Sequence, residues 1–308
     1  MNASLLRNRM SSAGTFLKEY IEYLLVKGIF AFLRKLSPEC SSNLGGWVGR
    51  FLGPKLPVSK IAHQNLQLVM PELSEHKRNK IIRGMWDNLG RNIGEFPHLS
   101  KLKENTPMGP GWEVVGAQYL TEQEKHGGAV IFVSGHLGNW EMLPMGVARY
   151  GVPFSSFYRA ANNKHVNKLI LDLRAEAMGC SIPMFPKGAK GARQALKHLI
   201  QGGRLGVLSD QKMNDGIEVP FFGKPAMTSS AVASLALRLE CPVIPGYVER
   251  LGPARLRIIV EPPIKYSLNR NNNESITILT GIINNKIESW IRKKPEIWLW
   301  IHKRWPKN

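Results

Sequence analysis

The stretch AVIFVSGH at residues 129–136 decides the fold of this chain. Its first five residues are apolar without a break, which is typical of a strand buried on both faces of a sheet. A helical segment is predicted after it, at 138–150, and Gly135 and Gly138 permit a sharp turn between the two. Because strands of this kind belong mainly to parallel sheets covered by helices, the stretch predicts an α/β fold.

The same alternation of strands and helices continues toward the C-terminus. Apolar segments predict further strands at 152–158, 204–209, 243–248 and 256–260. Helices are predicted between and after them, at 163–178, 188–199, 229–239 and 276–292. This order indicates a single α/β sandwich with a mostly parallel sheet.

The N-terminal part of the chain is predicted to be helical. The apolar stretch 16–36 is interrupted by charged residues, which are Lys18, Glu19, Glu22, Lys27, Arg34 and Lys35. A spanning helix needs about 20 mostly apolar residues, so an amphipathic segment that anchors the chain at a membrane surface is favoured. A first helix packed on the core is the alternative. We therefore expect a membrane-anchoring helical region at 1–55 and a catalytic domain at 56–308.

The charge of the chain is strongly positive. Lys and Arg number 42 against 23 Asp and Glu, which gives a net charge of +19. Such a surface prefers nucleic acid, acidic lipid headgroups, phosphorylated substrates or an acidic carrier protein, and charge alone does not choose among them. With three scattered cysteines and no His-Glu-x-x-His motif, neither a disulfide framework nor a zinc enzyme is favoured. The missing Gly-x-Ser-x-Gly elbow argues against a serine hydrolase of that kind.

His136 and Glu141 form the first candidate catalytic pair. His136 directly follows the strand at 129–133, and catalytic groups of open α/β sheets gather at the carboxyl ends of strands. A carboxylate bonded to one imidazole nitrogen fixes the tautomer and leaves the other nitrogen as a base. The pair can meet if His136 precedes the helix and Glu141 lies in its first turns. A loop histidine beside an ordinary helix carboxylate is the alternative.

Other charged residues also follow predicted strands. Arg159 comes after the strand at 152–158, and Asp210 comes after the strand at 204–209. Convergence of His136, Arg159 and Asp210 is what one active-site rim should produce, although single charged residues are usually solvated loop groups. The basic glycine loop at 187–193 could cradle a phosphate or form a flexible turn.

Two aromatic segments remain open in their interpretation. The apolar segment 219–225 contains Phe221, Phe222 and Gly223, and it could line an acyl groove or plug the core. The C-terminal tryptophans are interleaved with basic residues, a mixture that suits a membrane interface or single-stranded nucleic acid. Burial of these tryptophans in the core is the simplest interpretation.

Taken together in chain order, these residues resemble a known family, the late acyltransferases of lipid A biosynthesis of the lauroyl and myristoyl type. This family lies within the lysophospholipid acyltransferase superfamily, and the resemblance extends from about residue 60 to the end. The motifs that carry it are Ala62-His63-Gln64-Asn65-Leu66 with Pro71, Trp86-x-Asn88-Leu89-Gly90-Arg91-x-x-x-Glu95, Gly135-His136-x4-Glu141, Tyr158-Arg159, Arg174, Ser209-Asp210-Gln211, Val219-Pro220-Phe221-Phe222-Gly223 and Trp298-Leu299-Trp300-x-His302-x-Arg304-Trp305.

The resemblance implies a reaction and a location. An acyl chain would pass from an acyl carrier protein to a hydroxyl of the Kdo-bearing lipid A precursor, at the cytoplasmic face of the bacterial inner membrane. His136 would be the general base and Glu141 would orient it. No cofactor, metal or nucleic acid is implied. The residues expected to bind substrate or neutralise charge are Arg159, Arg174, Asp210, Gln211, Phe221, Phe222 and Gly223.

Two alternatives stay open. A glycerophospholipid or lysophospholipid acyltransferase of the same superfamily would carry similar motifs. A basic nucleic-acid-binding protein is the alternative from another class, and it predicts steep salt dependence of DNA or RNA binding.

Overall fold

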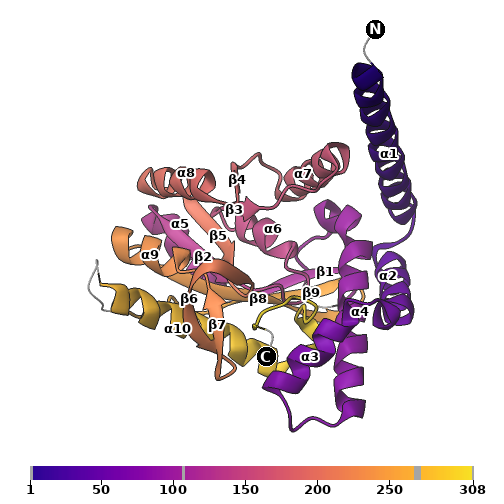
Figure 1. The fold of residues 1–308 in the computed structure, drawn as a ribbon. Coiled ribbons are helices and arrows are strands. Elements are labelled where there is room, and N and C mark those ends of the chain that lie inside the picture. The colour runs from indigo at the N-terminus through magenta and orange to yellow at the C-terminus, as the bar shows by residue number, and fades with distance from the viewer. Residues whose placement is uncertain (1–2, 106–107, 267–271, 307–308) are drawn as a thin grey trace.

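A mixed sheet of seven strands forms the centre of the computed structural model, which describes residues 3–105, 108–266 and 272–306, with side chains from residue 15 onward (Figure 1). Neighbouring strands are parallel except for the antiparallel pair β8–β9. In spatial order the strands are β1 (Gly111–Val115), β9 (Arg255–Val260), β8 (Val243–Gly252), β2 (Val130–Ser134), β5 (Arg204–Leu208), β3 (Ser155–Tyr158) and β4 (Met184–Pro186). The predicted mostly parallel sheet is confirmed.

Helices cover both faces of this sheet. The helices of the described chain are α1 (Ala3–Leu33), α2 (Pro38–Leu52), α3 (Ser59–Val69), α4 (Glu75–Glu95), α5 (Ala117–His126), α6 (Met142–Arg149), α7 (Lys164–Met178), α8 (Ala189–Ile200), α9 (Ala231–Leu239) and α10 (Asn273–Lys293). Short 3-10 helices lie at Gly53–Lys55, Phe96–Lys101 and Pro295–Ile297.

Strand β2 shows how the sequence pattern produces the two layers. All five of its residues are buried. Ile131 and Val133 point into one core, which α3, α4, α8, α9, α10 and the C-terminal segment share. Val130 and Phe132 point into the other, beneath α5, α6 and α7. Burial on both faces, as the continuous apolar run predicts, therefore places the end of β2 in the middle of the molecule.

Several elements were not predicted from the sequence. These are α5 and the short edge strands β1 and β4 of the main sheet, together with a separate hairpin of β6 (Lys212–Phe221) and β7 (Lys224–Thr228). Most of the apolar segment 219–225 lies in this hairpin. Only Phe222 and Gly223 form the turn, both at positive φ.

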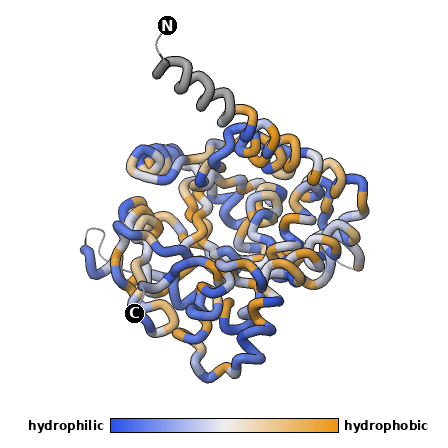
Figure 2. Tube along the Cα trace, turned by 45° about the vertical axis from the view of Figure 1, so that its right-hand side comes forward, coloured by the Kyte–Doolittle hydropathy of each residue, from blue (hydrophilic) through white to orange (hydrophobic). Residues whose placement is uncertain are grey.

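Helix α2 packs along α4, helix α1 touches α7, and both N-terminal helices leave much apolar surface exposed. Helix α1 contacts α7, where Asn163 Nδ2 donates to the Glu19 carbonyl at 2.6 Å. Within the described residues, no helix has both the length and the apolar composition required to cross a bilayer. Figure 2 shows hydrophobic positions along the coloured part of α1. The domain division at residue 55 stays a prediction.

Candidate active site

The register of two neighbouring strands brings the candidate catalytic residues together. Parallel β2 and β5 pair with Ser134 opposite Leu208. Each strand is followed, two residues beyond this pair, by a candidate functional residue: His136 after β2 and Asp210 after β5. The Ser209 amide also donates to the Ser134 carbonyl at 2.8 Å, which ties the two loops together. The convergence of strand ends that the sequence predicts is confirmed for this pair.

Asp210 holds His136 through two hydrogen bonds. The imidazole Nδ1 lies 2.8 Å from Asp210 Oδ1, and the backbone amide of His136 donates to Oδ2 at 3.0 Å. Asp210 is buried, whereas His136 is open to a cavity. An ionised Asp210 requires the proton on Nδ1, so Nε2 carries the free lone pair. The Gln211 amide lies 3.5 Å from Nε2.

The charges of this pair reinforce one another. Burial opposes the charged form of His136, but the Asp210 carboxylate and its hydrogen bond outweigh it and raise the pKa of His136 above 6.5. Burial alone would raise the pKa of Asp210, yet His136 and the hydrogen-bond donors hold it well below its usual range. Asp210 is therefore an anion at neutral pH, and His136 becomes a free base as the pH rises through its raised pKa.

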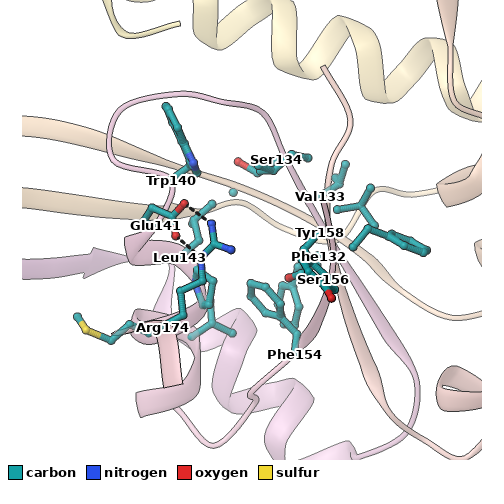
Figure 3. Close-up of a pocket in the computed structure, with 18 of the residues that line it drawn as sticks. Phe132, Val133, Ser134, Trp140, Glu141, Leu143, Phe154, Ser156, Tyr158 and Arg174 are labelled. Atoms are coloured by element: carbon teal, nitrogen blue, oxygen red, sulfur yellow. Dashed lines mark hydrogen bonds and ion pairs between the residues drawn. The ribbon is translucent and has the colours of Figure 1, made fainter. Parts of the chain in front are cut away.

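Glu141 has a different partner from the one predicted. Both of its carboxylate oxygens accept from Arg174 of α7, at 2.8 Å from Nε and 2.7 Å from Nη2 (Figure 3). The hydrogen bond expected from Glu141 to the imidazole is made by Asp210 instead. Glu141 stands at the N-cap position of α6, near enough to contribute to the raised pKa of His136. The Glu141–Arg174 pair thus forms one wall beside the base.

A cavity of about 440 Å³ opens in front of His136. Its wall is mostly apolar and comes from both strands and helices. It includes Phe132, Leu143 and Phe154 (Figure 3), together with Ala177 and Ile244. The polar residues in its lining include Ser134, His136, Glu141, Arg159, Arg174, Lys187 and Gln211. This volume is in the usual range for a ligand pocket, roughly 300–1,000 Å³. An apolar pocket with a basic, histidine-bearing polar part suits an acyl chain with a reactive end.

The predicted substrate residues separate into two groups. Arg159, Arg174 and Gln211 line the cavity, as expected of groups that contact substrate. Phe221 and Phe222 do not line it. They are buried among Trp298, Trp300 and Trp305 as part of the core, because the hairpin folds its tip onto the C-terminal segment. Gly223 serves the hairpin turn with φ +68°.

Asp210 also departs from its predicted role. Its carboxylate is 2% exposed and does not line the cavity. It hydrogen-bonds to the imidazole, the contact that was expected of Glu141. Lys187, from the basic glycine loop before α8, does line the cavity. The sequence indicated Lys187 only as a possible phosphate-binding residue, and its position after β4 was hidden because that strand was not predicted.

A buried polar network fixes the loop between His136 and Glu141. The carbonyl of Gly138 accepts from Asn88 at 2.9 Å and from Asn92 at 2.6 Å. Asn139 Nδ2 donates to Glu95 at 2.8 Å, and Glu95 in turn pairs with Arg250. A Cβ at Gly138 would meet the Val248 carbonyl oxygen at 1.9 Å, so only glycine fits there. The motif at 88–95 therefore holds the loop between His136 and Glu141 in place through hydrogen bonds.

The site is equipped for proton transfer by amino-acid side chains. Among the residues that the structure describes, no group of three or more His, Cys, Asp and Glu side chains could hold a metal ion. A carboxylate-bound imidazole with a free Nε2 can act as a general base on a group bound in the cavity.

Comparison with known proteins gives a consistent result. A sequence model of the family described as bacterial lipid A biosynthesis acyltransferase matches residues 10–307. A lipid A biosynthesis acyltransferase from Haemophilus influenzae is 24% identical over 294 residues, covering 91% of this chain and 84% of that protein. A lipid A biosynthesis lauroyltransferase from Escherichia coli is 24% identical over 252 residues, covering 80% of this chain and 78% of that protein.

Proposed function

We propose a mechanism for a chain that belongs to the bacterial lipid A biosynthesis acyltransferases: His136 is the general base, Asp210 orients it, and the donor is an acyl carrier protein thioester. Family membership makes the chain an acyltransferase with a lipid A-type acceptor. It favours this interpretation over a nucleic-acid-binding protein. The observation that carries the mechanism is the carboxylate-bound His136 facing an apolar cavity.

In the proposed reaction, His136 Nε2 removes the proton from an acceptor hydroxyl. The hydroxyl oxygen attacks the thioester carbonyl, an ester C–O bond forms and the C–S bond breaks. The departing thiolate then takes the proton from Nε2, so no protein nucleophile is needed. The electrostatic attraction of Asp210 stabilises the imidazolium formed on the way.

The polar part of the cavity would bind the charged parts of both substrates. Arg159 and Lys187 bring positive charge to the cavity wall, where the charge of Arg174 is paired with Glu141. Guanidinium groups bind phosphate with matched geometry, and a lysine binds it as a point charge. These groups fit the phosphates of a lipid A precursor, and the net charge of +19 also favours an acidic carrier protein.

Offering two acceptors in parallel tests the proposed function. Purified protein and acyl carrier protein thioester are incubated with a Kdo-bearing lipid A precursor or with lysophosphatidic acid. Mass spectrometry should show one added acyl group on the precursor and none on the lysophospholipid. Acylation of the lysophospholipid alone would assign the chain to the glycerophospholipid branch.

Filling the cavity should shorten the preferred acyl chain. Ala177 is buried on α7 and lines the cavity, so Ala177→Leu places new methyl groups where the chain would lie. One methylene in an apolar pocket is worth about 10- to 200-fold in specificity. The kcat/KM ratio of long to short donors should therefore fall at least roughly tenfold. Ala175→Leu on the same helix, outside the cavity lining, is the control, and an unchanged ratio in Ala177→Leu would rule out this acyl site.

We also propose that the N-terminal helices rest on an anionic membrane at the cytoplasmic face. Their exposed apolar side chains, here called the N-terminal apolar surface, are Phe16, Leu17, Tyr20, Ile21, Leu24, Leu25, Ile29, Phe32, Trp47, Val48, Phe51 and Leu52. Apolar patches of this kind on a folded protein mark interaction sites. Lys18, Lys27 and Lys55 lie along the same segments and suit acidic headgroups.

Charges placed in this surface should weaken vesicle binding. Leu25 is 62% exposed and Phe51 is 55% exposed. Burying such a side chain in lipid contributes about 1.5–3 kcal/mol, so Leu25→Glu and Phe51→Glu should each lower co-sedimentation with anionic vesicles at least tenfold. Ile200→Glu on α8 is the control, because Ile200 is equally exposed but lies far from α1 (Figure 1). Equal sedimentation of all variants would refute this mode of attachment.

A further inference from the structure

The C-terminal segment supplies a hydrogen bond to the catalytic carboxylate. Trp298 Nε1 donates to Asp210 Oδ2 at 2.7 Å. Oδ2 also accepts the His136 amide, while Oδ1 bonds to the imidazole. Trp298 and Asp210 are both nearly completely buried. Because hydrogen bonds to charged groups are stronger than neutral ones, this indole is well placed to fix the carboxylate.

Trp298 itself is held firmly. It lies in an isolated bridge with Leu137, and the Gly138 amide donates to the Ile297 carbonyl at 3.0 Å. Its ring meets Trp300 edge-on, with 4.6 Å between ring centroids. Asn65 fixes the following residues by donating to the carbonyls of Trp300 and His302, both at 2.7 Å. The indole therefore has little freedom to leave Asp210.

We propose that Trp298 is a positioning residue of the active site, which orients Asp210 so that His136 keeps Nε2 free toward the cavity. This inference rests on the proposed role of His136 as the base. The simplest interpretation of the sequence makes the C-terminal tryptophans core residues, and Trp300 and Trp305 fit that role: their indole nitrogens bond to backbone carbonyls. Trp298 differs from these two because its partner is the carboxylate bonded to His136.

Trp298→Phe removes the donor while keeping an aromatic ring. Without that donor the charge on Asp210 is less stabilised, so the carboxylate attracts the imidazolium proton more strongly and the pKa of His136 rises further. We expect kcat to fall about 10- to 100-fold, from a lost hydrogen bond to a charged group, with KM nearly unchanged. The acidic limb of the pH–rate profile should move up by about half a unit.

The matched control is Trp305→Phe. Trp305 is also buried and loses an indole bond of 3.1 Å, but this bond goes to the Phe221 carbonyl. Neither variant alters the other groups that act on the pair, which are Glu141, Lys187 and His302 around His136, and Arg304 near Asp210. A difference between the two variants in pH profile therefore reports the bond to Asp210 rather than lost packing.

Two measurements decide the proposal. One is kcat and KM against pH for the wild type and both variants, and the other is NMR titration of the His136 imidazole. If Trp298→Phe misfolds, a benzothienylalanine at position 298 keeps the ring shape and lacks the N–H. Equal kcat and equal His136 titration in Trp298→Phe and Trp305→Phe would overturn the inference. A wild type without acyl transfer would defeat the proposed function, and the NMR titration would still test the positioning.

Discussion

Replacing His136 with alanine should lower kcat for acyl transfer by about 10²- to 10⁴-fold, the usual contribution of a general base. The acceptor hydroxyl would lose its imidazole base, because among the described residues of the chain no other histidine lines the cavity. KM for both substrates should change little, because the apolar wall, Arg159 and Lys187 remain. The comparison is made in steady-state acyl transfer with circular dichroism as a check on the fold.

Two further variants make this result interpretable. His136→Asn keeps an amide that can donate to Asp210, so it preserves the buried hydrogen bond but cannot act as a base; it should be as inactive as His136→Ala. His126→Ala, at the exposed end of α5, should behave as the wild type. Activity of His136→Asn within about threefold of the wild type would show that His136 is not the base.

Replacing Glu95 with alanine should lower the free energy of unfolding by about 3–5 kcal/mol, as expected when one partner of a buried ion pair is removed. Glu95 is fully buried and bonds to four groups from separate parts of the chain. These are the Arg250 guanidinium, the Ser42 hydroxyl, the Asn139 amide and the Ala254 backbone amide. In the variant these donors are left without their acceptor, and Arg250 becomes a buried unpaired cation.

An exposed ion pair provides the comparison for Glu95. Asp172 pairs with Lys168 on α7, where the side chains are 60% and 77% exposed. Such pairs contribute about 0–1 kcal/mol, so Asp172→Ala should unfold at nearly the same urea concentration as the wild type. A loss below about 1 kcal/mol in Glu95→Ala would mean that the network does not support the catalytic loop.

The sequence predicts the centre of this fold because its signals are local. The side chains of a continuous apolar run such as 129–133 point to both faces of a strand, so they leave water only when both faces are covered. Strand β2 is indeed buried throughout. The alternation of strands and helices then predicts a parallel sheet. Because the carboxyl ends of parallel strands lie at the same edge, His136 and Asp210 are expected there together. Short edge strands such as β4 carry too few residues to show a pattern, which is why they were missed.

Pairing between distant residues could not be predicted. Proximity in sequence favoured Glu141 as the partner of His136, whereas the pairing of β2 with β5 places Asp210 there, 74 residues away. Arg174 then takes both oxygens of Glu141, a contact that depends on how α7 crosses α6. The burial of Phe221 and Phe222 likewise depends on the C-terminal tryptophans that pack against them, a contact between distant segments that no local pattern shows.

The most direct measurement is the mass of lipid A from a host that lacks secondary acyl chains, with and without this protein. The wild-type chain should add one acyl group in ester linkage, and His136→Asn, produced at the same level, should leave the mass unchanged. A wild-type chain that leaves lipid A unaltered would contradict acyl transfer to this acceptor, and an active His136→Asn would contradict the base assigned here.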